Sequence, residues 1–177
     1  MTDMFLSVEK RILMAYREFF GEEYVPSQKQ NTDIHVRVHK MCYLMSRIDC
    51  DIIDDGFVWN TFGPFSVDLQ EVLKQVDTKR DALREFYQNY APNDILDADI
   101  LEGIDRLKNG LQVSSYKENS RYWVELLASI AFIAHSELPT SAFDYINAEL
   151  KGRKSAYVCD AENKKAWILL NELGVVN

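Results

Sequence analysis

The sequence has few of the residues that cross-link a chain or anchor it in a membrane. Its three cysteines, Cys42, Cys50 and Cys159, are odd in number and form no C-x-x-C pair, so a disulfide framework is not expected. The longest apolar stretch, residues 126–134, is interrupted by Ser129 and falls far short of the ~20 residues of a membrane span. Because the first residues also lack the pattern of a secretory signal, we expect a cytoplasmic protein that does not bind membranes.

The sequence also has fewer basic than acidic residues. The chain has 20 Lys and Arg against 28 Asp and Glu, a formal net charge of −8. Nucleic-acid affinity depends largely on Lys and Arg that displace counterions from phosphates, so this balance disfavours a nucleic-acid partner. Two short basic groups, residues 151–154 and 164–165, are flanked by acids and are interpreted as solvated surface.

Hydrophobic residues make up 47% of the 177 positions, which is enough for one domain with its own core. We find no repeat, low-complexity tract or long linker, and predict a single domain over residues 1–177. The apolar residues recur with a helical period in most segments. The sequence therefore predicts an all-α fold, a single compact bundle of seven or eight helices. The predicted helices cover residues 5–21, 33–48, 66–76, 82–90, 100–111, 122–135, 141–150 and 160–174.

One of these segments, residues 122–135, is apolar nearly all round and is predicted to be the central helix. Glu125 lies within it, and a buried carboxylate without a partner is costly. We expect Glu125 to form an internal ion pair with Arg37 or Lys40 of the second helix, in preference to acting as a titrating acid.

A short aromatic segment separates the second and third helices. Residues 57–62 are rich in β-branched and aromatic side chains and predict a strand or extended loop. Gly63 and Pro64 are expected to form a turn, and Ser66 to cap the next helix, whose inward stripe begins at Val67. The aromatic residues are expected to close over the helix that carries Lys40 and Tyr43; they are Phe57, Trp59, Phe62 and Phe65.

The sequence contains no complete catalytic or metal-binding motif. His35 and His39 are spaced i, i+4 on a predicted helix, but a zinc-protease motif would need a glutamate that is absent there. The acidic residues of segment 49–55 lack the glycine and the distal glutamate of a calcium loop. We therefore expect no metal, no cofactor and no enzymatic activity.

Three segments together resemble a known family. They are residues 37–45 (RVHKMCYLM), residues 57–69 (FVWNTFGPFSVDL) and residues 123–130 (WVELLASI). In this combination the chain resembles the YwgA-like family and the related Panacea domain of SocA-type antitoxins. The resemblance implies a compact helical domain that binds proteins, as an antitoxin or as an adaptor that presents a toxin to a protease. It also implies a binding site, formed by Arg37, Lys40, Tyr43, Trp59, Gly63, Pro64, Phe65, Ser66 and Glu125.

Three functional hypotheses follow. The first is a non-catalytic protein-interaction module whose partner is a toxin or a protease component. The alternative is a sensor for a small molecule or nucleotide, with an aromatic pocket near Trp59 and Phe65 and with Glu125 and Lys40 as its polar pair. The third is a DNA-binding regulator. The sequence leaves the identity of the partner and the oligomeric state open.

Overall fold

The computed structural model describes residues 5–26, 32–53, 56–110 and 120–176. This part of the chain is mostly helical, with nine α-helices, eight of them of seven or more residues, and one two-stranded hairpin. The predicted all-α fold is therefore confirmed. The elements are α1 (Ser7–Phe20), α2 (Thr32–Ser46), β1 (Phe57–Asn60), β2 (Gly63–Ser66), α3 (Val67–Asp77), α4 (Arg80–Asn89), α5 (Pro92–Ile95), α6 (Ala98–Gly110), α7 (Ser120–Phe132), the π-helical η1 (Ile133–Glu137), α8 (Phe143–Arg153) and α9 (Asp160–Glu172).

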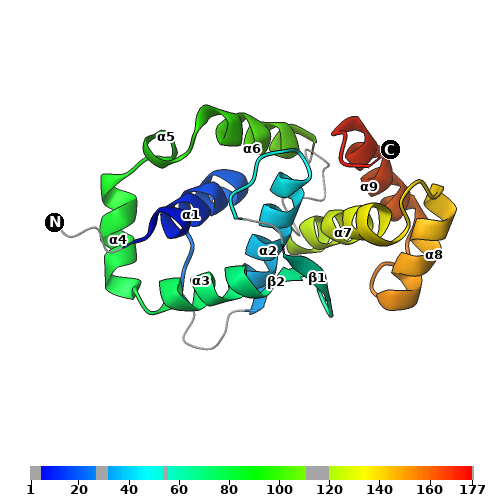
Figure 1. Ribbon diagram of the computed structural model, residues 1–177, viewed down its shortest axis with the longest axis horizontal. Coiled ribbons are helices and arrows are strands. Elements are labelled where there is room, and N and C mark those ends of the chain that lie inside the picture. The colour runs from blue at the N-terminus through cyan, green and yellow to red at the C-terminus, as the bar shows by residue number, and fades with distance from the viewer. Residues whose placement is uncertain (1–4, 27–31, 54–55, 111–119, 177) are drawn as a thin grey trace.

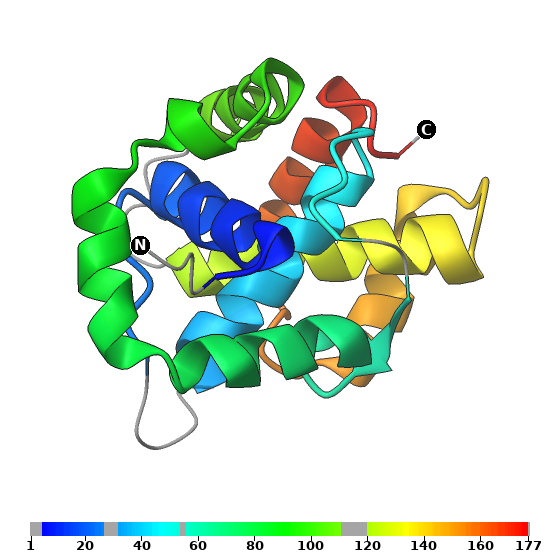
Figure 2. The ribbon, with the colours of Figure 1, turned by 60° about the vertical axis from the view of Figure 1, so that its left-hand side comes forward.

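Two helices cross at the centre of the molecule, α2 and α7 (Figures 1 and 2). Residues 123–132 of α7 are all buried, which confirms the predicted central helix. The apolar stripe of α2 is buried as well, and it comprises Val38, Met41, Cys42, Met45 and Ile48. Burying one Leu, Val or Met side chain contributes roughly 1.5–3 kcal/mol, so the crossing of α2 and α7 is a major part of the core. Helices α1 and α3–α6 lie on one side of this crossing and α8 and α9 on the other (Figure 1).

Local signals set several helix ends. Helix α1 stops at Gly21, which has a φ of 69° and donates its N–H to the carbonyl of Arg17, the usual left-handed helix stop. Helix α3 begins after Ser66, whose hydroxyl accepts the N–H of Leu69 at 3.3 Å. That is the cap predicted from the sequence.

Several details differ from the sequence prediction. The short helix α5 was not predicted, although Pro92 fits the first turn of a helix. The central helix continues into a π-helix at residues 133–137. Val67 is 60% exposed and does not point inward, because it is the first residue of α3. The connector 27–31, residues 54–55 of the acidic segment, Leu111 and most of loop 116–120 lie outside the described residues.

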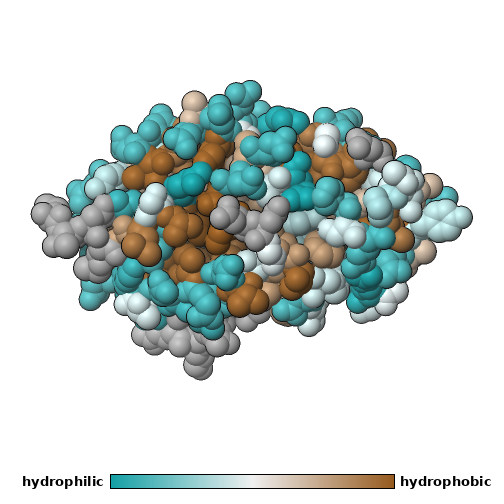
Figure 3. Space-filling view, in the orientation of Figure 1, coloured by the Kyte–Doolittle hydropathy of each residue, from teal (hydrophilic) through white to brown (hydrophobic). Residues whose placement is uncertain are grey.

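No helix in the described part of the chain is long and apolar enough to cross a membrane. On the face shown in Figure 3, polar residues cover much of the surface, while hydrophobic residues gather over α1 and α3. Exposed apolar side chains also occur at the hairpin, where Val58 is 54% and Phe62 is 37% exposed.

Candidate functional site: a pocket between the hairpin and the second helix

The aromatic segment of residues 57–62 forms β1 and the turn of a hairpin that packs against the core. Strands β1 and β2 are antiparallel, with Phe57 opposite Ser66 and Asn60 opposite Gly63. The turn is formed by residues 61–62, where the Asn60 side-chain oxygen accepts the N–H of Thr61 at 2.6 Å. The predicted turn at Gly63 and Pro64 is therefore wrong, since these residues open β2. Gly63 nevertheless has a φ of 91°, a conformation that favours glycine.

Strand β2 packs against both α2 and α7. Phe57 meets Tyr43 with ring centroids 5.2 Å apart, and Phe65 stacks on His39 at 4.5 Å. These two contacts agree with an aromatic segment that closes over α2. Trp59 instead packs against Phe132 of α7 at 5.8 Å.

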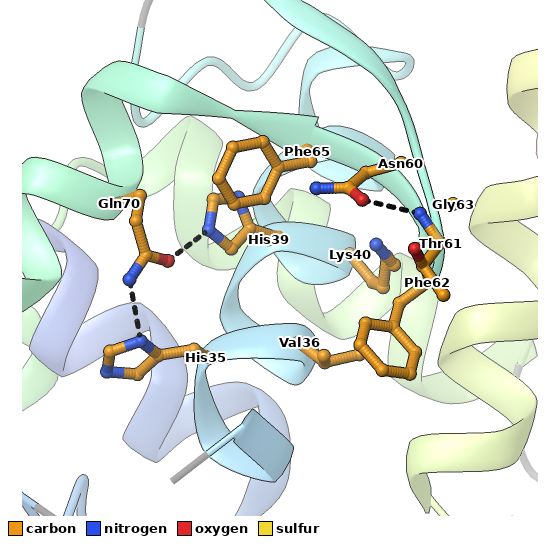
Figure 4. Close-up of a pocket in the computed structure, with 10 residues that line it drawn as sticks. All are labelled: His35, Val36, His39, Lys40, Asn60, Thr61, Phe62, Gly63, Phe65 and Gln70. Atoms are coloured by element: carbon orange, nitrogen blue, oxygen red, sulfur yellow. Dashed lines mark hydrogen bonds between the residues drawn. The ribbon is translucent and has the colours of Figure 1, made fainter. Parts of the chain in front are cut away.

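A pocket of about 250 Å³ lies between α2, the hairpin and the first turn of α3 (Figure 4). Helix α2 contributes its wall from His35 to Lys40, and the hairpin contributes the turn and Phe65. The complete lining is His35, Val36, His39, Lys40, Asn60, Thr61, Phe62, Gly63, Phe65 and Gln70.

A directed chain of hydrogen bonds runs along one wall of this pocket. The backbone N–H of Ser66 donates to Nδ1 of His39 at 3.2 Å, so the ring proton of His39 must be on Nε2, which lies 3.2 Å from Oε1 of Gln70. The amide nitrogen of Gln70 then donates to Nδ1 of His35 at 3.2 Å (Figure 4). His35 in turn donates from Nε2 to Asp77 at 3.0 Å. The Ser66 N–H thereby fixes the tautomer of both histidines.

In both histidines, each ring nitrogen is hydrogen-bonded to a protein group. Burial lowers the pKa of His39 to about 3, despite the opposing effect of its hydrogen bond with Gln70. His39 is therefore neutral at physiological pH. An acid–base role for either imidazole would require breaking the chain of hydrogen bonds, so this wall provides shape and neutral polar groups.

Lys40 is the buried cation of the pocket. It is 2% exposed, and its ammonium donates to the carbonyl of Pro64 at 2.5 Å. Burial lowers the pKa of Lys40 to about 7, the Glu125 carboxylate opposes this decrease, and Lys154 and Arg121 add to it. Between pH 7 and the ordinary lysine value the folded state binds fewer protons than the unfolded state. The unfolding free energy contributed by Lys40 therefore rises with pH across this interval.

Glu125 is buried and ion-paired, but not with the expected residues. Its carboxylate accepts a hydrogen bond from the ammonium of Lys154 and lies 3.8 Å from the guanidinium of Arg121. Arg37 pairs instead with Glu22 at 2.6 Å and Asp33 at 3.1 Å. The prediction of a pair with Arg37 or Lys40 is therefore wrong, because the partner comes from the end of α8.

The burial of Lys154 also differs from the sequence prediction. It belongs to the basic group that was interpreted as solvated surface, yet it is 8% exposed. Its ammonium lies 5.7 Å from the ring centroid of Trp59 and 5.5 Å from that of Tyr157. Burial lowers the pKa of Lys154, and the hydrogen bond to Glu125 opposes that effect.

The structure brings only part of the residue set implied by the resemblance to one place. Lys40, Gly63 and Phe65 line the pocket, and Pro64 and Ser66 contact α2 through their main chain. The remaining members do not line it: Arg37, Tyr43, Trp59 and Glu125. The sensor hypothesis therefore keeps Phe65 and Lys40 but loses Trp59 and Glu125 as pocket residues.

Sequence reasoning did not predict four pocket contributors: Val36, Asn60, Thr61 and Gln70. The i, i+4 spacing of His35 and His39 was the one signal in the sequence for this wall of the pocket. It was considered only as the spacing of two metal ligands. In the structure Gln70 bridges the two rings. The described residues contain no group of three or more side chains suited to hold a metal ion.

Comparison of the chain with protein-family models, with curated proteins and with solved structures gives no match in any of the three. The resemblance to the YwgA-like family and the Panacea domain therefore stays a prediction.

Proposed function

We propose that this protein is a non-catalytic interaction module that binds a partner protein at its hairpin. The observation that carries the proposal is the outward position of β1. Strand β2 is packed on α2 and α7, whereas β1 makes its main contacts with β2. The second edge of β1 thus has no strand partner among the described residues, and such an edge can accept an extended segment of another chain.

Exposed apolar side chains also occur on the hairpin and directly after it. Val58 projects from β1, Phe62 from the turn and Val67 from the start of α3, and all three are exposed. Apolar and aromatic side chains at the centre of an interface typically carry much of its affinity. The combination of an open strand edge and these side chains supports a protein partner.

The geometry of the pocket wall agrees with a non-catalytic role, because both histidines are fully engaged with protein groups. The resemblance to antitoxins and protease adaptors suggests the class of partner, a toxin or a protease component. The same proposal places the protein in the cytoplasm. Because the net charge of −8 disfavours contacts with phosphates, we do not propose DNA binding.

The test is co-expression with the protein encoded by the adjacent reading frame, with co-purification and growth as the two measurements. We expect Phe62→Glu, and separately Val58→Lys, to weaken the complex by about 2 kcal/mol each, roughly 30-fold in Kd, as for a central interface residue. If the neighbouring protein is toxic, these variants should also fail to neutralise it.

Tyr145→Lys is the matched control, since Tyr145 is 70% exposed but lies on α8. It should leave binding unchanged. Failure of the wild type to bind the neighbouring protein would contradict the proposal, and so would equal binding by wild type and both hairpin variants.

A second candidate, a small-molecule sensor, is favoured by the pocket that holds Lys40. Its volume of about 250 Å³ lies below the roughly 300–1,000 Å³ of typical sites for drug-sized ligands. A nucleotide is therefore disfavoured, whereas a smaller molecule or a single side chain fits.

A further inference from the structure

The ammonium group of Lys40 has more donors than acceptors. A charged lysine carries three N–H donors, and the structure gives Lys40 one acceptor, the Pro64 carbonyl. No carboxylate in the described part of the chain lies within ion-pair distance of its Nζ. Burying N–H donors of a cation without hydrogen-bond acceptors costs free energy. The side chain of Lys40 is therefore stabilised either by losing its proton or by a ligand that supplies a further acceptor.

The charges around Lys40 do not balance. The groups that act on it electrostatically are Glu125 and Arg121 on α7 and Lys154 at the end of α8. Glu125 already pairs with Lys154, and Arg121 pairs with Asp33 at 3.2 Å as well as approaching Glu125 at 3.8 Å, so Lys40 is left without a carboxylate partner of its own among the described residues. On its own helix the titratable residues that line the pocket beside Lys40 are His39, which is neutral, and His35. The pocket residues of the hairpin and α3 are uncharged: Asn60, Thr61, Phe62, Gly63, Phe65 and Gln70.

The pocket combines this cation with aromatic walls. Phe62 and Phe65 line it from the hairpin, and the guanidinium of Arg121 lies 5.4 Å from the ring centroid of Phe62. One available cation matches a singly charged anion, whereas a phosphate dianion would leave a buried charge uncompensated. The aromatic rings favour an apolar group attached to that anion.

We infer that this pocket binds a carboxylate, supplied by a small organic acid or by a peptide, with Lys40 as its counter-ion and Phe62 and Phe65 against its apolar part. The inference does not depend on protein binding at the hairpin edge, because a small acid alone can test it. The depressed pKa of Lys40, about 7, adds a pH signature. Only the protonated amine attracts the carboxylate, so affinity falls as pH rises.

The first experiment titrates the intact protein with sodium benzoate and with benzamide, its neutral analogue, by calorimetry and NMR at pH 6.5. Benzoate should bind at least roughly tenfold more tightly than benzamide and should shift the resonances of residues 60–63. Between pH 6.5 and 8.5 its apparent affinity should fall about 25-fold, because the protonated fraction of a group with a pKa near 7 falls by that factor. Benzamide should show no such dependence.

Two variants localise the binding. Lys40→Met should abolish benzoate binding, with the fold checked by its thermal unfolding transition. Lys74→Met removes an exposed lysine of α3 and should leave benzoate affinity unchanged. Because the wild-type comparison of benzoate with benzamide needs no variant, the test holds even if Lys40→Met folds poorly.

A pair of short peptides that end in phenylalanine, one with a free and one with an amidated carboxyl terminus, distinguishes the two sources of carboxylate. Preference for the free peptide over benzoate assigns the pocket to a peptide, and the reverse assigns it to a small acid. Equal binding of benzoate and benzamide, absence of binding by both carboxylate probes, or undiminished benzoate binding by Lys40→Met would overturn the inference.

Discussion

Replacing Glu125 by glutamine is expected to lower the free energy of unfolding by about 3–5 kcal/mol, because it leaves buried cations without their carboxylate. Lys154 loses its hydrogen-bonded partner, Arg121 loses a nearby counter-charge, and Lys40 loses the one carboxylate that raises its pKa. Urea unfolding at pH 7 measures the change.

A double-mutant cycle identifies the partner. Lys154→Met in the Glu125→Gln background should recover part of the loss, since it removes the uncompensated charge. Glu149→Gln is the control, because Glu149 forms an i, i+4 pair with Arg153 and is 42% exposed in its side chain. An exposed pair of this kind contributes at most about 1 kcal/mol. A coupling energy of zero between Glu125 and Lys154 would show that the ion pair is not formed.

Replacing Gly63 by valine is expected to cost about 2–6 kcal/mol, for two separate reasons. A Cβ at this position would lie 2.6 Å from the hydroxyl oxygen of Ser129 on α7, and overpacking of a core typically costs about 1–3 kcal/mol. The φ of 91° adds a backbone strain of about 1–3 kcal/mol for a residue with a side chain. The urea midpoint should fall accordingly.

Gly21→Val separates the two contributions. Gly21 has a φ of 69°, but a Cβ there would meet nothing within 4 Å. The variant should therefore show the backbone strain without the steric clash and cost less than Gly63→Val. If the two variants were equally destabilised, the close approach of the hairpin to α7 would not be the cause.

Much of the fold could be predicted because helical periodicity is a local property. The buried stripe of α2, the all-apolar α7 and the Ser66 cap each depend on residues within a few turns. The hairpin turn was misplaced because Gly63 and Pro64 are residues typical of turns. Their actual places are set by packing of β2 between α2 and α7. Helix α5, which begins at Pro92, has only four residues and was not predicted because so short a segment shows no helical period.

The site was less predictable because its contacts join distant segments. A buried charge on α7 could be foreseen, but Lys154 lies 29 residues from Glu125, and nothing in its local sequence marks it as buried. The role of Gln70 between His35 and His39 likewise depends on how α3 docks against α2. The residue types indicated that buried polar groups such as Glu125 needed partners. Which residues those partners are depends on the tertiary packing.

The central feature of this site is Lys40, a buried cation that lines an open pocket. An NMR pH titration of the Lys40 side-chain Cε, assigned by its loss in Lys40→Met, tests this directly. We expect a pKa of about 7 for Lys40, because burial disfavours the charged form and Glu125 opposes this effect incompletely. A pKa near the ordinary lysine value of about 10.4 would mean that the ammonium is solvated, and would contradict the closure of the hairpin over α2.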